Sequence, residues 1–235
     1  MVNELLWILL ILINFTGIIL AYRFFGKTAL YSWMAMSIII ANIQVMKTIK
    51  LFGLVASLGN IIYATSFLVT DILQENYGKK EAKKAIWIGF FSLVTTAVIM
   101  QVCLLFIPYA SDNVSMALQN IFGILPRITL ASLAAYILSQ YHDVWAFQFW
   151  KGIFKGKHLW IRNNLPTITS QLIDNIIFTW IAFVGLFGLF GWKQIFSWNI
   201  IIQIFIVSYV TKFIVSFCDI PFLYWSRIIK KKYNL

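Results

Sequence analysis

Residues Phe67 to Gly78 read F-L-V-T-D-I-L-Q-E-N-Y-G and close an apolar segment that begins near Gly59. This stretch places Thr70, Asp71 and Glu75 inside or at the edge of a predicted membrane span. A carboxylate inside a span costs several kcal/mol unless it faces a polar cavity or a partner, so it marks a candidate functional site. Because Asp71 and Glu75 are four positions apart, a helix would place them on one face.

The composition of the chain indicates an integral membrane protein. Of its 235 residues, 61% are hydrophobic, 17% aromatic and only 11% charged, and the mean hydropathy is +0.83. Spans of about 20 residues leave room for roughly six or seven helices and no soluble domain. The apolar runs are long and continuous, whereas a transmembrane barrel would show short alternating segments. The predicted fold is therefore all-α, a polytopic membrane helical bundle forming one domain over residues 1–235.

Seven apolar runs are expected to cross the membrane. The first is preceded by Glu4 without a basic segment and has no cleavage pattern after it, so it is interpreted as a span and not a signal peptide. The longest connection, Tyr141–Asn164, mixes lysines with aromatic residues and is expected at the headgroup level. A short uncharged connection covers Phe52–Leu58. The runs are Leu5–Tyr22, Tyr31–Leu51, Gly59–Tyr77, Ala85–Ile107, Asn120–Gln140, Leu165–Phe190 and Phe196–Trp225.

The distribution of basic residues predicts the orientation. Connections one, three and five and the C-terminal tail hold 14 Lys and Arg residues, whereas the other connections hold 3 even when Lys47 and Lys50 are included. Cytoplasmic loops carry this excess, so we expect a multi-pass protein of the plasma membrane with its N-terminus outside and its C-terminus in the cytoplasm. The net charge of +11 is scattered over helix ends, so nucleic acid is not an expected partner.

The sequence does not indicate an enzyme or a metal-binding protein. The chain has no HExxH, GxSxG or phosphate-binding Gly-rich motif, so an enzyme is not expected. His142, His158, Cys103 and Cys218 lack metal-ligand spacing, and the two cysteines are expected to be small core residues. No metal or cofactor is expected. A carrier, a channel and a membrane scaffold remain, and mixed polar groups on several spans favour the carrier.

Asp174 is the deepest acid of the chain. It lies about 13 Å into the sixth run at ~1.5 Å rise per residue, near the bilayer midplane. One interpretation is a buried ion pair with Lys212. The other is that Asp174 binds a solute in a central cavity together with Gln171 and its neighbours Ser170 and Asn175.

Further polar residues could line the same cavity. Arg127 either extends its side chain outward or points inward to a carboxylate or a carbonyl oxygen. Asn42, in the second run, and Gln140, which ends the fifth, could bind a flat polar molecule. Glu75 is either a ligand or a solvated counter-charge beside the following lysines. Asp219, close to Pro221, is interpreted as marking a helix end.

Three stretches together resemble the queuosine precursor transporter family, also called the vitamin uptake transporter family. The resemblance runs from about Ile38 to Arg227. Some family members have six spans, so it implies six core helices within residues 31–235 and an extra N-terminal span within residues 1–30. The stretches are F-L-V-T-D-I-L-Q-E-N-Y-G with the basic cluster and W-I-G-F that follow it, R-I-T-L-A-S-L-A-A-Y-I-L-S-Q-Y-H-D-V-W-A-F over Arg127–Phe147, and S-Q-L-I-D-N-I-I-F-T-W-I-A-F over Ser170–Phe183.

This resemblance implies import of 7-deazaguanine compounds, namely 7-cyano-7-deazaguanine, 7-aminomethyl-7-deazaguanine or queuine, by a secondary or facilitated alternating-access mechanism. A carboxylate, Asp71 or Asp174, would accept the paired N–H donors of a guanine-like edge. The alternatives are a substrate-binding subunit of an ATPase-energised uptake system and a non-transport membrane scaffold. Oligomerisation stays open. The remaining expected ligands are the donors Arg127, Asn42, Gln171 and Gln140, the neighbours Glu75 and Thr70, and the aromatic residues Tyr63, Phe67 and Phe178.

Overall fold

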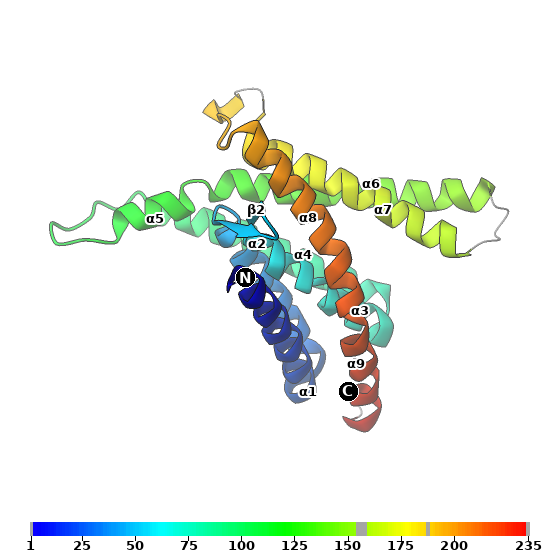
Figure 1. Cartoon of the computed structure of the whole chain (residues 1–235). Coiled ribbons are helices and arrows are strands. Elements are labelled where there is room, and N and C mark those ends of the chain that lie inside the picture. Colours follow the sequence, from blue (N-terminus) through cyan, green and yellow to red (C-terminus); the bar gives the residue numbers. More distant parts are fainter. Residues whose placement is uncertain (1, 154–158, 187–188, 234–235) are drawn as a thin grey trace. The chain divides into compact units, whose positions relative to one another are not determined.

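The computed structural model describes residues 2–153, 159–186 and 189–233. It divides into two compact units, residues 1–126 with 210–235 and residues 127–209, and each is described by itself. The elements in chain order (Figure 1) are α1 Val2–Gln44, β1 Thr48–Leu51, β2 Leu54–Ser57, α2 Gly59–Thr65, α3 Phe67–Tyr77, α4 Lys79–Cys103, α5 Ser115–Phe122, α6 Leu125–Ile153, α7 Leu159–Thr179, a π-helical turn Trp180–Val184, a 3₁₀ turn Leu189–Gly191, α8 Trp198–Cys218 and α9 Ile220–Tyr233.

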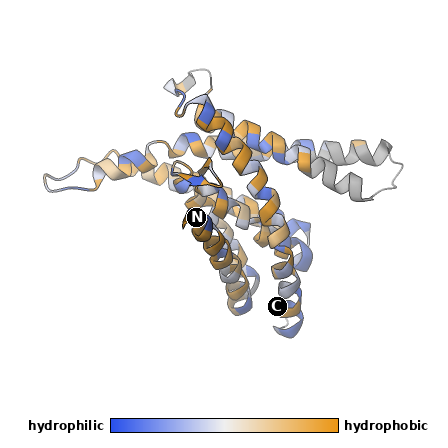
Figure 2. Cartoon of the chain, in the orientation of Figure 1, coloured by the Kyte–Doolittle hydropathy of each residue, from blue (hydrophilic) through white to orange (hydrophobic). Residues whose placement is uncertain are grey.

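This helical architecture confirms the predicted all-α membrane bundle. Apolar residues cover much of α1, α4 and α8, and polar residues gather toward the helix ends (Figure 2). The number of membrane crossings stays a prediction, as does the division into an extra span and a family core. In the described part of the chain, four helical segments are long and apolar enough to cross a membrane: Val2–Gln44, Lys79–Cys103, Ser115–Ser139 and Trp198–Cys218.

Helix α1 contains the first two predicted runs as its two halves. The backbone leaves the helical region at Gly26, where φ is 63° and ψ is −149°. A residue without a Cβ adopts this conformation at little cost. The two halves pack against each other, because a Cβ on Gly17 would lie 2.4 Å from the ring of Trp33. The first half also contacts α9, where the rings of Phe15 and Phe222 are 4.9 Å apart.

The second predicted run is wrong at its end, because the helix stops at Gln44 and the chain then forms a β-hairpin. Strands β1 and β2 are antiparallel, with Leu51 opposite Leu54. The two residues of the turn, Phe52 and Gly53, have φ values of 50° and 86°, as in the tight turns that match strand twist. The segment Phe52–Leu58, predicted to be an irregular connection, therefore contains one of the two strands of a sheet.

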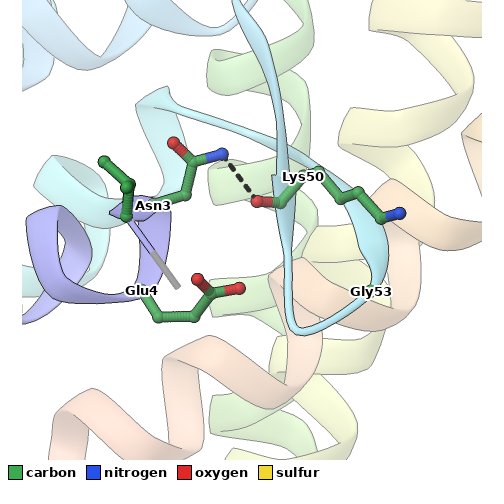
Figure 3. Close-up of a pocket in the computed structure, with 5 residues that line it drawn as sticks. Asn3, Glu4, Lys50 and Gly53 are labelled. Carbon is green, nitrogen blue, oxygen red and sulfur yellow. Dashed lines mark hydrogen bonds between the residues drawn. The ribbon is translucent and has the colours of Figure 1, made fainter.

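The hairpin is attached to the start of α1 (Figure 3). Asn3 Nδ2 donates a hydrogen bond to the carbonyl oxygen of Lys50 at 2.9 Å. Glu4 Oε1 accepts one from the backbone N–H of Phe52 at 3.0 Å. A pocket at this junction is lined by Val2, Asn3, Glu4, Lys50 and Gly53. None of the predicted ligands contributes to it.

The third predicted run is helical throughout, as α2 and α3 with a turn at Ser66 between them. Its start packs closely on the second half of α1. A Cβ on Gly59 would lie 2.2 Å from the carbonyl oxygen of Ala41, so only glycine allows this approach. Gly78 ends α3 and connects it to α4.

The predicted connection Tyr141–Asn164 is wrong for most of its length. Helix α6 continues to Ile153 and α7 already begins at Leu159. Between Tyr141 and Phe149 the chain has no proline or glycine to end a helix, and the rings of Trp145 and Phe149, one turn apart, stack at 5.4 Å. The two helices lie side by side (Figure 1), where His142 Nδ1 is 3.1 Å from Ser170 Oγ.

The ends of the last two predicted runs also differ. After α7, the π-helical turn ends at Gly185, whose φ is 100°, and not at Phe190. The final run breaks at Asp219 and resumes as α9, which continues to Tyr233. The expectation that Cys103 and Cys218 are core residues is wrong, because both are exposed on this chain.

Candidate functional site

The predicted ligands fall into two groups. Those of the first unit lie on α1, α2 and α3, and those of the second lie on α6 and α7. Each group is therefore considered within its own unit. A single cavity built from both groups stays a prediction.

Asp71 is half-buried on α3, on the same helix as the predicted ligands Phe67 and Thr70. Thr70 Oγ1 donates a hydrogen bond to the carbonyl oxygen of Phe67 at 2.8 Å, so its proton is used within its own helix. Within the described residues, the Asp71 carboxylate has no hydrogen-bond donor and no lysine or arginine at ion-pair distance. An acid with these surroundings can take up a proton or a polar solute.

A second acid, Asp219, lies close enough to Asp71 for the two carboxylates to interact electrostatically. Asp219 sits between α8 and α9, is only 3% exposed, and has a buried Oδ2 atom with no hydrogen-bond partner among the described residues. Helix α9, which begins directly after Asp219, packs against α3 (Figure 1). Asp219 lies at a helix end, as its position in the sequence indicated. Its proximity to Asp71 was not predicted.

The two aromatic candidates of the first unit contact each other. The rings of Tyr63 and Phe67 meet edge to face with centroids 5.5 Å apart. The Nζ atom of the buried Lys212 lies 5.4 Å from the Tyr63 ring centroid. A stacked heterocycle would have to share this surface with Lys212.

Asn42 and Glu75 both have protein partners. Asn42 is buried and donates from Nδ2 to the carbonyl oxygen of Ile38 at 2.7 Å. Glu75 Oε1 lies 3.0 Å from Arg227 Nη2, and both side chains are largely exposed. This contact supports the interpretation of Glu75 as a counter-charge, while its role in binding stays a prediction.

A polar network lies next to this ion pair and connects α1, α3 and α9. We call it the Asn76 network: Tyr22, Asn76, Tyr77, Ser226 and Lys230. Asn76 Nδ2 donates to Tyr22 Oη at 3.2 Å and to Ser226 Oγ at 3.3 Å, and the hydroxyls of Tyr22 and Tyr77 are 3.1 Å apart. Lys230 donates to the Asn76 carbonyl oxygen and lies 4.7 Å from the Tyr77 ring centroid. None of these residues stands out in the sequence, because each is of a common type near the end of an apolar run.

In the second unit, Arg127 points inward and is 5% exposed. Its Nε donates to the carbonyl oxygen of Ile181 at 2.9 Å, and its Nη1 donates to that of Lys193 at 2.7 Å. The guanidinium also lies 5.7 Å from the ring centroid of Trp192. Of the two predicted orientations, the inward one toward carbonyl oxygens is confirmed. Nη2 is buried without a hydrogen-bond partner among the described residues, so it can still donate to a ligand.

The other second-unit candidates lie along α7. Gln171 and Asp174 are half-buried one turn apart, and Gln171 Oε1 is buried without a hydrogen-bond partner in the described part of the chain. Phe178 packs edge to face on Phe183 at 5.9 Å. The proposed pairing of Asp174 with Lys212 would join the two units and stays a prediction. The side chain of Gln140 lies outside the described residues.

The neighbours expected beside Asp174 have structural partners. Asn175 is buried and donates from Nδ2 to the Phe205 carbonyl oxygen on α8 at 2.9 Å, and Ser170 contacts His142. The described residues contain no group of three or more His, Cys, Asp or Glu side chains placed to hold a metal ion. Among the described atoms of this unit, the amide oxygen Oε1 of Gln171 and the Nη2 group of Arg127 are buried without a hydrogen-bond partner and could bind a ligand.

The four long apolar helical segments of the described residues define an integral membrane protein with several candidate spans. The family described as "Putative vitamin uptake transporter" matches residues 57–226, so the chain belongs to this transporter family. It is 44% identical over 228 residues, which cover 97% of this chain and 96% of the relative, to a protein of Bacillus subtilis (strain 168) named "Probable queuosine precursor transporter". No solved structure matches the chain.

Proposed function

We propose that this protein imports 7-deazaguanine precursors of queuosine across the plasma membrane by a secondary or facilitated alternating-access mechanism. The observation that supports this most strongly is the similarity to the Bacillus subtilis protein, which extends over nearly the whole of both chains. The partly buried acids of α3 and α7 supply a chemical reason, because apolar helices retain such groups where a polar solute or a proton is bound.

The chemistry of a deazaguanine matches the polar groups of the site. Its edge presents adjacent N1–H and N2–H donors, which one carboxylate can accept together. Asp174 or Asp71 would supply that carboxylate. The carbonyl of the base needs a donor, and the unused Nη2 of Arg127 is the first candidate, followed by the amides of Asn42, Gln171 and Gln140.

Aromatic rings would hold the flat heterocycle. Tyr63 and Phe67 form a pair on α2 and α3, and Phe178 lies on α7 one turn beyond Asp174. Stacking on such rings does not depend on the 7-substituent of the base. The hydrogen bonds would select for the guanine edge, because a base without that edge would leave buried polar groups of the protein unpaired. Glu75 and Thr70 would border the site through α3.

Uptake measurements test the proposal. Cells that cannot make or import the precursor would receive the chain, and uptake of labelled 7-cyano-7-deazaguanine would be followed. Asp174→Asn and Asp71→Asn should reduce uptake by about tenfold or more, since a charge-assisted hydrogen bond contributes about 1.5–3 kcal/mol. Near-normal uptake by both variants would contradict the proposed site.

Asp112 provides the matched control. It is exposed in the connection between α4 and α5, where the Ser115 hydroxyl and the N–H groups of Val114 and Ser115 hold the pKa of its carboxyl below the usual range. Asp112→Asn should therefore leave uptake unchanged. Purified chain in liposomes should also carry the base. If uptake requires an added ATPase module, the protein is a subunit of an energised system instead.

A further inference from the structure

We propose that Asp71 and Asp219 together hold one proton and form the site that couples proton movement to solute import. This inference rests on the proposed function and identifies what drives it. It also separates two tasks, because Asp174 in the second unit would then be the carboxylate that binds the base.

Two acids that are far apart in the chain approach each other in the first unit. Asp71 is on α3, and Asp219 is at the break between α8 and α9. Helix α3 packs against α9, which begins directly after Asp219, so the two carboxylates lie close enough for each charge to affect the other. Two negative charges held close together and away from water repel each other, and sharing a proton removes that repulsion.

The hydrogen bonding of Asp219 is incomplete among the described residues. Its side chain is 3% exposed, and its buried Oδ2 has no donor within the part of the chain that the structure describes. A buried carboxylate oxygen without a donor is costly. A bound proton would make this group neutral and supply the missing donor between the two acids.

Neither acid is neutralised by a cation among the described residues. No lysine or arginine of the described residues lies at ion-pair distance from either acid. Several charged groups of α1, α4, α8 and α9 contact other partners: Lys27 with Glu81, Arg23 with Tyr233, Lys84 with Tyr31, Lys212 with Tyr63, Arg227 with Glu75, and Lys230 with the Asn76 carbonyl oxygen and Tyr77. The remaining lysines of α4 and α9 include Lys79, Lys80, Lys83 and Lys231, which are exposed.

A proton fits this site better than a metal cation. Cations such as Na⁺ or Ca²⁺ need several oxygen ligands, and the hydroxyl of Thr70, the residue before Asp71, is engaged with the carbonyl oxygen of Phe67. The described residues also contain no cluster of three or more acidic, His or Cys side chains. A proton needs only the two carboxylates, as in other acid pairs.

Infrared difference spectroscopy tests proton binding without any transport. The purified full-length chain should show the C=O band of a protonated carboxyl group at neutral pH. Asp219→Asn and Asp71→Asn should each remove that band, and Asp112→Asn should retain it. Asp219→Asn keeps the shape of the side chain, and circular dichroism checks that it is folded. A band that persists in the folded Asp219→Asn variant would overturn the proposal.

Liposomes then test coupling. An inward gradient of one pH unit should support about tenfold accumulation of neutral 7-cyano-7-deazaguanine if one proton moves with each molecule. Asp219→Asn should lose this response and Asp219→Glu should keep part of it. Accumulation driven by a sodium gradient, or an unaltered pH response in Asp219→Asn, would overturn the coupling site. If the wild type carries no base at all, the proposed function itself fails, while the infrared result still decides whether the pair holds a proton.

Discussion

Arg127 donates a hydrogen bond from Nε to the carbonyl oxygen of Ile181 at 2.9 Å. Ile181 lies in the π-helical turn that ends at Gly185, and the last carbonyl groups of a helix have no helical donor. Arg127 supplies one, and it holds the following segment through Lys193 as well. The residue is thus a structural support of α7 in addition to a candidate ligand.

Replacing Arg127 by lysine should destabilise the protein. A lysine ammonium cannot reproduce the planar fork that reaches two carbonyl oxygens, so at least one bond is lost. We expect a loss of about 1.5–3 kcal/mol, measured by thermal unfolding in detergent. Arg227→Lys, in the exposed pair with Glu75, should cost about 0–1 kcal/mol. Equal losses for the two variants would contradict this role for Arg127.

Gly59→Ala should disturb the packing of α2 on α1. The new methyl group would lie 2.2 Å from the backbone oxygen of Ala41, which cannot rotate away. Overpacking of this kind costs about 1–3 kcal/mol. At Gly89 the nearest atom is the terminal Cδ1 of Ile38, which can move, so Gly89→Ala should lower the unfolding temperature less. The reverse order would show that the two helices approach differently.

The Asn76 network should stabilise the contact between α1, α3 and α9. Asn76→Ala removes the two amide hydrogen bonds to Tyr22 and Ser226 and leaves Tyr22 with Tyr77 alone. We expect a loss of about 1 kcal/mol in the free energy of unfolding. The matched control is Asn113→Ala, at an exposed position of the connection before α5, and it should have no effect. An unchanged Asn76→Ala protein would refute the stabilising role.

The predicted orientation can be tested with single cysteines. Cys103 and Cys218 are both exposed, so both are first changed to serine. A membrane-impermeant maleimide should label Asn113→Cys on intact cells, because the connection before α5 is expected outside. Lys231→Cys, in the basic end of α9, should react only after permeabilisation. Labelling of Lys231→Cys on intact cells would reverse the topology.

Local patterns predicted most of the helices. The runs beginning near Leu5, Gly59 and Ala85 agree with the observed helices, because hydropathy summed over about 20 residues reports burial in lipid whatever the partner helix is. The errors concern ends and short elements. Thr48–Ser57 forms a hairpin because the turn at Phe52 and Gly53 and the contacts of Asn3 and Glu4 favour it, and no hydropathy window includes those contacts.

Some residues of the candidate site could be selected from the sequence, and their roles in binding stay predictions. The acids Asp71 and Asp174 and the inward Arg127 could be selected because a charged residue is conspicuous in an apolar run. Asp219 was assigned only to a helix end, and the residues of the Asn76 network were missed. Their roles arise from neighbours on other helices, which the sequence order does not reveal.

The sequence by itself determined that this chain is a helical membrane protein, that acids lie within its apolar helices, and to which family it is similar. The helical membrane class depends on the solvent preference of each segment, and that preference is additive along the chain. The family similarity depends on the residues and the order of three stretches. Only the tertiary structure decided that Asp219 approaches Asp71, that Arg127 supports the end of α7, and that α1 folds back at Gly26. These depend on side-chain packing between distant segments, which is specific to each contact and cannot be summed from local patterns.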